Sequence, residues 1–292
     1  MAPSDQETLA PSPLREADLA DAEALVRESG WNQVAADWRA FLDLGSVYAI
    51  RTPSGRVIAT AATLPYGGRF AWISMVLVAG AYRRRGLATL LLRRCVDDLT
   101  ARGLVPVLDA TPAGRAVYVG LGFEDSWSFQ RYARGDASGP ARERVMPSGV
   151  TLAPISDDTW PRLCAYDAAV FGADRSGLLA RLRGRAPAFE CVAERDGEIV
   201  GAMLGRDGRV ATQIGPIVAE DDACAGALLA RALSAVPGPV FIDVPDSKGA
   251  LIGQLTAAGF AAQRPLTRML HRRNAAFDDG RRTYAVVGPE FG

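Results

Sequence analysis

The chain has 292 residues, with 33 basic and 33 acidic side chains and a formal net charge of zero. Half of the residues (49%) are hydrophobic, enough to build two cores at roughly 150 residues per domain. Without a net positive charge, nucleic acid and anionic membranes are not expected partners. The four cysteines form no CxxC pair and His271 is the single histidine, so neither a metal site nor Cys/His catalysis is expected.

Residues 1–13 are rich in Pro, Ser and acidic side chains and predict a disordered tail. They lack the basic and apolar segments of a secretion signal, and no apolar run in the chain reaches about 18 residues. A cytoplasmic protein with reduced thiols is therefore expected.

The first half, residues 14–134, alternates helix and strand patterns. Residues 14–30 predict a helix with Leu19, Ala22, Leu25 and Val26 on its buried face. A hairpin, a strand that runs into an Arg-rich apolar helix, a short strand ending in Asp109 and a final helix–strand unit follow. These elements occupy residues 46–64, 72–99, 105–111 and 117–132.

The polar, Gly- and Pro-rich residues 135–149 predict a linker. The second half, residues 150–292, repeats the same order of elements. Its helix, hairpin, strand–helix unit, strand and closing helix–strand unit fall at 153–172, 190–204, 212–233, 239–245 and 252–270. The sequence thus predicts an α+β (α/β mixed sheet) protein, two tandem domains that each have a mixed β-sheet flanked by helices. Residues 284–287 predict a further strand that docks on one of the sheets.

Three arginines and Gly86 lie where the strand ending at Val78 passes into a helix. A helix N-terminus offers unpaired N–H groups and partial positive charge, and a glycine there allows a bulky anion to approach closely. Arg83, Arg84 and Arg85 add charge around that site, so the pattern favours a pyrophosphate. Neither the Walker P-loop spacing nor GxGxxG is present.

The spacing Arg83-x-x-Gly86-x-Ala88 resembles the acetyl-CoA signature of the GNAT N-acetyltransferase superfamily, Arg/Gln-x-x-Gly-x-Gly/Ala. A second motif agrees, because Tyr118 precedes the pair Gly122-Phe123 by four residues, as in that family's later helix. The resemblance covers residues 14–134 in detail. It implies that acetyl-CoA is bound by Val76, Leu77, Val78, Arg83, Arg84, Arg85, Gly86, Leu87, Ala88, Thr89 and Thr111, where Thr111 replaces the family's usual Asn.

The resemblance also implies direct attack of an amine on the thioester through a tetrahedral intermediate. A backbone N–H near Val76 or Val78 would stabilise the oxyanion, and Tyr118 would protonate the departing thiolate. The family often uses a Glu on the neighbouring strand as base, and here that strand has none. Asp109 is the base candidate, with a helix or turn cap as its alternative role; Glu124 and Asp125 are further candidates.

The second half lacks both features of the cofactor site. Its loop carries Glu220, Asp221 and Asp222 in place of the arginines, and Leu255 occupies the place of Tyr118. Carboxylates would repel a pyrophosphate. The sequence therefore predicts a degenerate C-terminal domain that does not bind cofactor. Three roles are open to this domain: it stabilises the first, it forms dimer contacts, or it forms a wall of the acceptor pocket. The last is the preferred option.

Candidate acceptor contacts are Trp31 and Trp38 in the first half and Asp174 and Arg175 in the second. For each of them, a structural role in the core or at a helix cap is the leading alternative. The overall hypothesis is a cytoplasmic, acetyl-CoA-dependent N-acetyltransferase acting on a small-molecule or amino-acid-like amine, with a homodimer compatible with the sequence. The alternatives are a non-catalytic acyl-CoA sensor and a protein-amine acetyltransferase.

Overall fold

The computed structural model describes residues 10–135 and 146–292. Residues 1–9 of the predicted tail and 136–145 of the predicted linker lie outside the described residues. Ser12 and Pro13, assigned by sequence to the disordered tail, instead form strand β1 against β2. The guanidinium of Arg51 fixes them, because it donates to Ser12 Oγ at 2.6 Å and to the Pro13 carbonyl at 3.0 Å.

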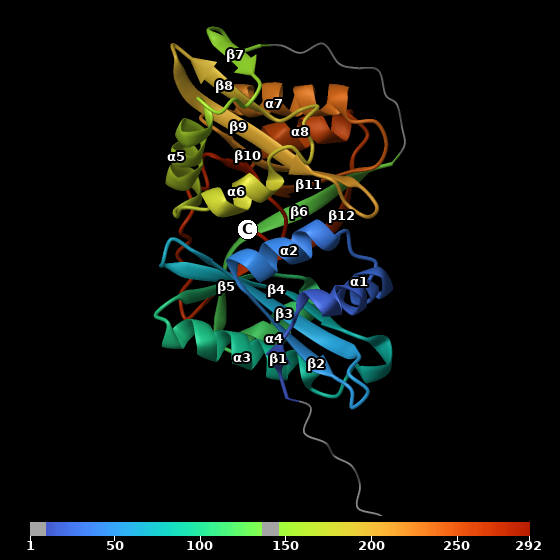
Figure 1. Ribbon diagram of the computed structural model, residues 1–292. Helices are drawn as coiled ribbons and strands as arrows, with labels where there is room; N and C mark the ends of the chain where they lie inside the picture. The colour runs from blue at the N-terminus through green and yellow to red at the C-terminus, as the bar shows by residue number, and fades with distance from the viewer. Residues whose placement is uncertain (1–9, 136–145) are drawn as a thin grey trace, which may run out of the picture.

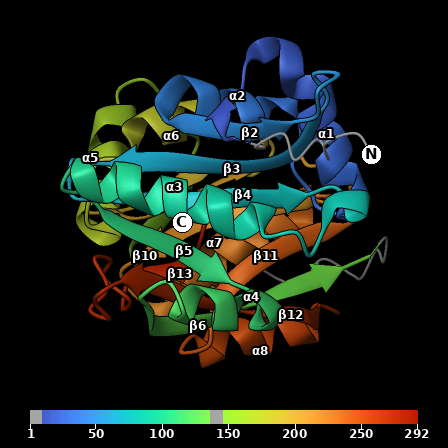
Figure 2. The same cartoon turned by 90° about the horizontal axis from the view of Figure 1, so that it is seen from below.

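The first half contains six strands and four α-helices within its described residues (Figure 1). The strands are β1 (Ser12–Pro13), β2 (Ser46–Arg51), β3 (Val57–Tyr66), β4 (Phe70–Val78), β5 (Val105–Ala110) and β6 (Phe123–Arg134). The helices are α1 (Leu19–Glu28), α2 (Ala35–Leu44), α3 (Leu87–Ala101) and α4 (Pro112–Val119). Helix α3 packs along β3 and β4, and α2 packs on β2 and β3 (Figure 2).

The described part of the second half repeats this arrangement and adds a closing strand. Its strands are β7 (Val150–Ala153), β8 (Cys191–Arg195), β9 (Glu198–Arg206), β10 (Thr212–Ala219), β11 (Val240–Pro245), β12 (Ala261–His271) and β13 (Thr283–Ala285). Its helices are α5 (Trp160–Phe171), α6 (Ser176–Leu182), α7 (Asp222–Ala235) and α8 (Gly249–Ala257). The predicted α+β class and the repeated unit are both confirmed. Helices α2 and α6 were not predicted.

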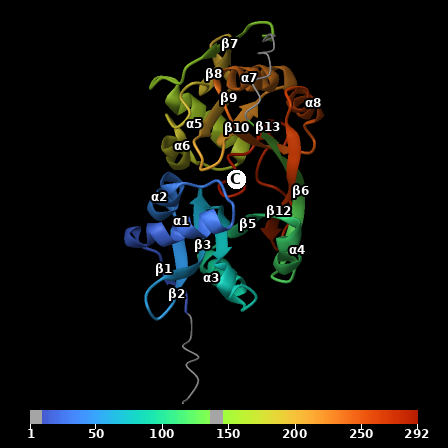
Figure 3. The ribbon, with the colours of Figure 1, turned by 90° about the vertical axis from the view of Figure 1, so that its right-hand side faces the viewer.

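The two halves share one continuous sheet. Its strand order is β1-β2-β3-β4-β5-β12-β6-β11-β10-β9-β8-β7, and β13 pairs with β10. Strand β12 of the second half lies between β5 and β6 of the first, and β6 pairs on its other side with β11. Figure 3 shows β6 and β12 running together along one side of both halves. Each half therefore depends on the other to complete its sheet.

The core also crosses the boundary between the halves. The predicted inner face of α1, Leu19, Ala22, Leu25 and Val26, is buried in the larger apolar cluster. That cluster includes Leu163 of α5, Leu179 of α6 and Phe291 near the C-terminal end. None of the helices in residues 10–135 and 146–292 combines the length and apolar character that crossing a bilayer requires.

Separating the halves should abolish cooperative folding of the first one. A fragment ending at Gly135 lacks β12, so the inner edges of β5 and β6 lose their hydrogen-bond partners. We expect thermal melting followed by circular dichroism to show no cooperative transition for this fragment. Co-expression with residues 146–292 is the control and should restore one. A fragment that melts cooperatively within about 5 °C of the full chain would contradict the shared-sheet account.

Candidate active site

The site begins where β4 and β5 separate. These parallel strands pair only from Phe70–Val105 to Trp72–Val107, although both continue beyond. On the other edge of β4, Ser74 pairs with Ala62 and Leu77 pairs with Thr60, so Met75 and Val76 together oppose one residue. Such a β-bulge bends the strand and re-aims its groups. A cleft therefore opens between the C-terminal parts of β4 and β5.

The Arg-rich loop leads from this cleft to the start of α3. Gly86 is the N-cap residue of α3 and adopts φ +78°, a left-handed conformation that glycine tolerates best. Within the described residues, the backbone N–H groups of residues 84–89 have no protein acceptor. Arg83 and Arg85 fold back on the loop, donating to the carbonyls of Val78 and Ala81 at 3.1 and 3.2 Å. The loop is thus a row of free donors surrounded by positive charge.

Tyr118 and Thr111 lie on α4, across the cleft. Thr111 is the N-cap residue of α4, and its Oγ1 accepts a hydrogen bond from the Gly114 N–H at 3.3 Å. The half-buried Tyr118 ring packs edge-to-face on Phe123, with centroids 6.2 Å apart. Burial raises the pKa of Tyr118, and its hydroxyl has no hydrogen-bond partner in residues 10–135 and 146–292. The phenol is therefore a protonated donor that is free to serve a ligand.

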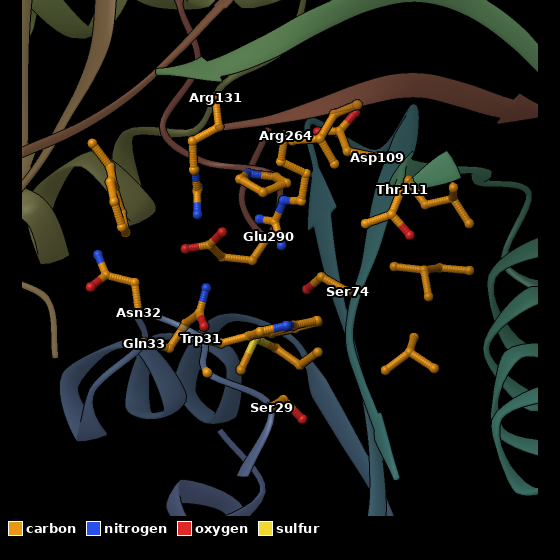
Figure 4. Close-up of a pocket in the computed structure, with 18 of the residues that line it drawn as sticks. Ser29, Trp31, Asn32, Gln33, Ser74, Asp109, Thr111, Arg131, Arg264 and Glu290 are labelled. Carbon is orange, nitrogen blue, oxygen red and sulfur yellow. The ribbon is translucent and has the colours of Figure 1, made fainter. Parts of the chain in front are cut away.

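A cavity of about 430 Å³ joins the cleft to the seam between the two halves (Figure 4). Its walls come from the loop after α1, from β4, β5, α4, β6, β11 and β12, and from the C-terminal segment. The lining residues include Trp31, Gln33, Ser74, Val76, Asp109, Thr111, Tyr118, Arg131, Phe241, Arg264 and Glu290. Trp31, Val76, Asp109, Thr111 and Tyr118, all named from the sequence, thus meet at one cavity.

Asp109 lines this cavity as half of a buried ion pair. Arg268 Nε and Nη2 donate to its two carboxylate oxygens at 3.0 and 3.1 Å. The Arg268 guanidinium lies over the rings of Trp72 and Trp127, 4.4 and 4.2 Å from their centroids. Burial raises the pKa of Asp109 to about 6, although Arg268 opposes that shift. Both oxygens are engaged with Arg268, so the cap considered as its alternative role is not the interaction found.

Glu124 and Asp125 lie at the surface at the start of β6. Asp125 accepts hydrogen bonds from the exposed Arg115, with Nε at 2.9 Å from each of its oxygens. Neither residue lines the cavity.

Glu290 is a cavity residue that sequence analysis did not identify. It is 3% exposed and its Oε1 accepts a hydrogen bond from Arg206, while its Oε2 is buried without a partner in the described chain. Neighbouring residues anchor it. Tyr66 Oη donates to the Phe291 carbonyl at 2.6 Å, and Trp72 Nε1 donates to the Pro289 carbonyl at 3.2 Å. The apolar residues before Glu290 indicated that this stretch docks on a sheet. The position of Glu290, however, depends on contacts between residues more than 200 positions apart in sequence.

Each half supplies one arginine to the cavity, Arg131 from the first and Arg264 from the second. Arg131 on β6 donates to Asp243 on β11 at 2.7 and 2.8 Å, and Gln213 also donates to Asp243 at 3.0 Å. The side chain of Arg264 on β12 makes no hydrogen bond or ion pair in the described residues. Figure 4 shows Arg131 and Arg264 extending from β6 and β12 toward Glu290.

Of the four acceptor contacts predicted from the sequence, the structure places one, Trp31, at the cavity. Trp31 lines the cavity, and its loop is held by the second half, since Arg209 Nε donates to the Trp31 carbonyl at 2.8 Å. Trp38, with 0% exposure, packs in the core against Phe41 instead.

Asp174 and Arg175 also lie away from the cavity. Asp174 accepts from the Ser176 N–H at 2.8 Å at the start of α6. Arg175 is buried in an ion pair with Asp167 at 2.7 Å and donates to the Gly292 carbonyl at 3.0 Å. Trp38 in the core and Asp174 at the start of α6 thus have the structural roles named above as alternatives. Arg175 forms an internal ion pair in place of the cap considered for it.

The corresponding cleft of the second half is occupied by the chain itself. Strands β10 and β11 pair only from Thr212–Val240 to Ile214–Ile242. Beyond that point β13 pairs with β10 at Ile217 and Val218, and the Val286 N–H donates to the Asp243 carbonyl at 3.1 Å. A Cβ at Gly215 would collide with the Val286 carbonyl, so the glycine allows this close approach.

Carboxylates of the chain itself occupy the N-terminus of α7. Asp221 accepts from the Cys224 N–H at 2.8 Å, and Asp222 accepts from Tyr284 Oη at 2.7 Å. These carboxylates lie where the first half presents free N–H groups and arginines. Residues 283–287 thus fill the second cleft, as a docked segment that the sequence predicted in general terms.

Two family models match the chain, one in each half. The acetyltransferase (GNAT) family matches residues 14–123, and an acetyltransferase (GNAT) domain matches residues 163–285. The protein is therefore a tandem acyltransferase that belongs to the GNAT acetyltransferases.

A curated relative is the uncharacterized N-acetyltransferase YitH of Bacillus subtilis (strain 168), 25% identical over 92% of this chain and 93% of that protein. Among solved structures, a putative acetyltransferase from Pyrococcus horikoshii aligns with a TM-score of 0.75 at 18% identity, covering 97% of this chain and 95% of that one. A tandem GNAT protein from the clavulanic acid biosynthesis pathway aligns with a TM-score of 0.66 at 15% identity, over 89% and 97%. At these identities the structures establish the common fold.

Proposed function

We propose that this protein transfers an acetyl group from acetyl-CoA to the amine of a small molecule, at one site in its first half. The observation that carries the proposal is that the β4 bulge and Tyr118, whose hydroxyl is unpartnered, line one cavity, and that β4 leads from there into the row of free N–H groups at residues 84–89. The family generally uses acetyl-CoA, and these groups suit its parts.

The loop would hold the pyrophosphate through the N–H groups of residues 84–89, with Arg83, Arg84 and Arg85 supplying positive charge. Of the remaining predicted contacts, Val76 and Thr111 line the cavity, and Val78, Ala88 and Thr89 stay predicted contacts. Leu77 and Leu87 are buried in the apolar core, so only their backbone groups could serve the cofactor. The separation of β4 from β5 leaves room for an extended ligand arm between the strands.

The reaction forms a C–N bond and breaks the C–S bond of the thioester. A backbone N–H near Val76 or Val78 would stabilise the oxyanion, and Tyr118 would donate its proton to the departing thiolate. The attacking amine must lose a proton. We assign Glu290 to receive it in preference to Asp109, because Arg268 occupies both Asp109 oxygens and Glu290 Oε2 has no partner.

The second half would bind no cofactor and would serve as a wall of the acceptor cavity. Residues 283–287 occupy its cleft, and Asp221 and Asp222 occupy the start of α7. Arg264, Phe241 and Glu290 come from that half and line the cavity. An enclosing wall contributed by both halves favours a small acceptor over a protein surface.

Acetyl-CoA should raise the melting temperature of the protein, and free CoA should do so as well, whereas ATP should not. A ligand at about 100 times its dissociation constant stabilises by roughly 2.7 kcal/mol. Gly86→Glu should abolish the shift, because it places a carboxylate against the pyrophosphate. Gly86→Ala is the matched control: its Cβ meets nothing within 4 Å, so it tests backbone strain at φ +78° alone. A shift of equal size in Gly86→Glu, or no shift at millimolar acetyl-CoA, would refute this site.

Tyr118→Phe should lower kcat by about 100-fold and leave acetyl-CoA affinity nearly unchanged, since the phenol acts on the leaving group. Burial raises the pKa of Tyr118 above its ordinary value of about 10, which extends the protonated form to higher pH. The kcat of the native enzyme should therefore hold from about pH 8 to pH 10. Full turnover in Tyr118→Phe would contradict the assignment of Tyr118 as the acid. So would a native enzyme whose kcat falls below about pH 9 on the alkaline side while that of Tyr118→Phe does not.

A further inference from the structure

Unsatisfied polar atoms are concentrated in the cavity. In the described chain, nine buried side-chain nitrogen and oxygen atoms have no hydrogen-bond partner. Four of the nine belong to cavity-lining residues, namely Gln33 Oε1, Ser74 Oγ, Arg264 Nε and Glu290 Oε2. Since an unmade hydrogen bond at a buried polar atom is costly, such a cluster indicates that a polar ligand completes it.

The four atoms are of two chemical kinds. Gln33, Ser74 and Glu290 present oxygen acceptors, and the Glu290 carboxylate is ionic. This set suits the three N–H donors of a primary ammonium group. Gln33 and Glu290 are also held in place, since both are at most 5% exposed and Arg206 fixes the other oxygen of Glu290.

Arg264 is the exception among the arginines of this region. Arg131 is paired with Asp243 at 2.7 Å, and Arg268 with Asp109 at 3.0 Å. The side chain of Arg264 forms no ion pair or hydrogen bond within residues 10–135 and 146–292. Burial and the nearby Arg131 lower its pKa, although the Asp243 and Glu290 carboxylates oppose that shift without forming an ion pair with it. A planar guanidinium in this state suits a carboxylate or a phosphate.

We propose that the acceptor is a zwitterion, an amine that also carries an anionic group, of which an amino acid is the simplest case. Its ammonium group binds Glu290 with Gln33 and Ser74, and its anionic group binds Arg264. No ion pair joins Glu290 to Arg264 in the structure, so a ligand of both charges satisfies the two residues together. The proposal rests on the proposed acetyl transfer and names the substrate class of the same site.

The apolar part of the cavity indicates which side chain the acceptor would carry. Trp31, Phe241 and Leu266 line it beside the charged groups. These side chains provide an apolar surface for the remainder of the acceptor, so apolar or aromatic amino acids are the first acceptors to test.

The test compares acceptors that differ only in the anion. The common amino acids, their carboxamides, the corresponding amines without the carboxyl group, and 2-aminoethyl phosphate are each incubated with acetyl-CoA and the full-length protein, and CoA release is measured. At least one acid should be acetylated with kcat/KM about 10- to 100-fold above its carboxamide, the effect expected from one charge-assisted hydrogen-bonded pair. Preference for the phosphate would assign the anion as a phosphate instead of a carboxylate, within the same proposal.

Variants assign the effect to Arg264. Arg264→Gln should raise KM for the preferred acid and bring the acid-to-carboxamide ratio of kcat/KM to within about 3-fold of one, with partial rescue by Arg264→Lys. Because Arg264 has no partner to lose, the variant should fold. Arg56→Gln, the same change at an exposed arginine, should keep the native ratio.

Three outcomes would overturn the proposal while acetyl-CoA still stabilises the protein: carboxamides acetylated as well as acids, an unchanged ratio in Arg264→Gln, or zwitterions that are neither acetylated nor bound. Loss of acetyl-CoA stabilisation itself would instead defeat the proposed function. The two failures are therefore distinguishable.

Discussion

The site depends on the point at which β4 and β5 stop pairing. Their parallel ladder ends at Trp72–Val107, and the bulge at Met75 and Val76 turns the rest of β4 away. Without that separation β4 and β5 would form a continuous ladder, and no opening would lie between them beside the start of α3. The separation instead opens a cavity that is lined by Val76 of β4, by Tyr118 and by residues at the seam between the halves, and β4 leads on from it to the loop that carries the free N–H donors.

The same separation occurs in both halves, but only the one in the second half is filled by the chain itself. In the second half, residues 283–287 pair with β10 and close the gap. The chain then continues to the first half, where Tyr66 and Trp72 bind the carbonyls of Phe291 and Pro289 and Arg206 binds Glu290. One segment therefore fills the degenerate cleft and delivers a carboxylate to the open one. The second half contributes to the site through this segment and through Arg264.

Local patterns in the sequence predicted the repeated fold, because each of its elements depends on residues close in sequence. The proposed roles of the Arg83–Thr89 loop and Tyr118 rest on patterns that are equally local. Sequence analysis did not identify Glu290 and Arg264, because the roles proposed for them depend on which partners are absent and which distant strands are adjacent. The insertion of β12 between β5 and β6 is equally non-local. Trp38 and Arg175 resembled ligand contacts in sequence, but the core and Asp167 engage them.

The central claim is that one fold is used twice while only the first copy binds acetyl-CoA. Isothermal titration calorimetry of the full-length protein with acetyl-CoA measures this directly as the number of sites per chain. The account predicts one site, because the docked segment and the Asp221 and Asp222 carboxylates block the second cleft. Two equivalent sites, or saturable binding that survives Gly86→Glu, would contradict it.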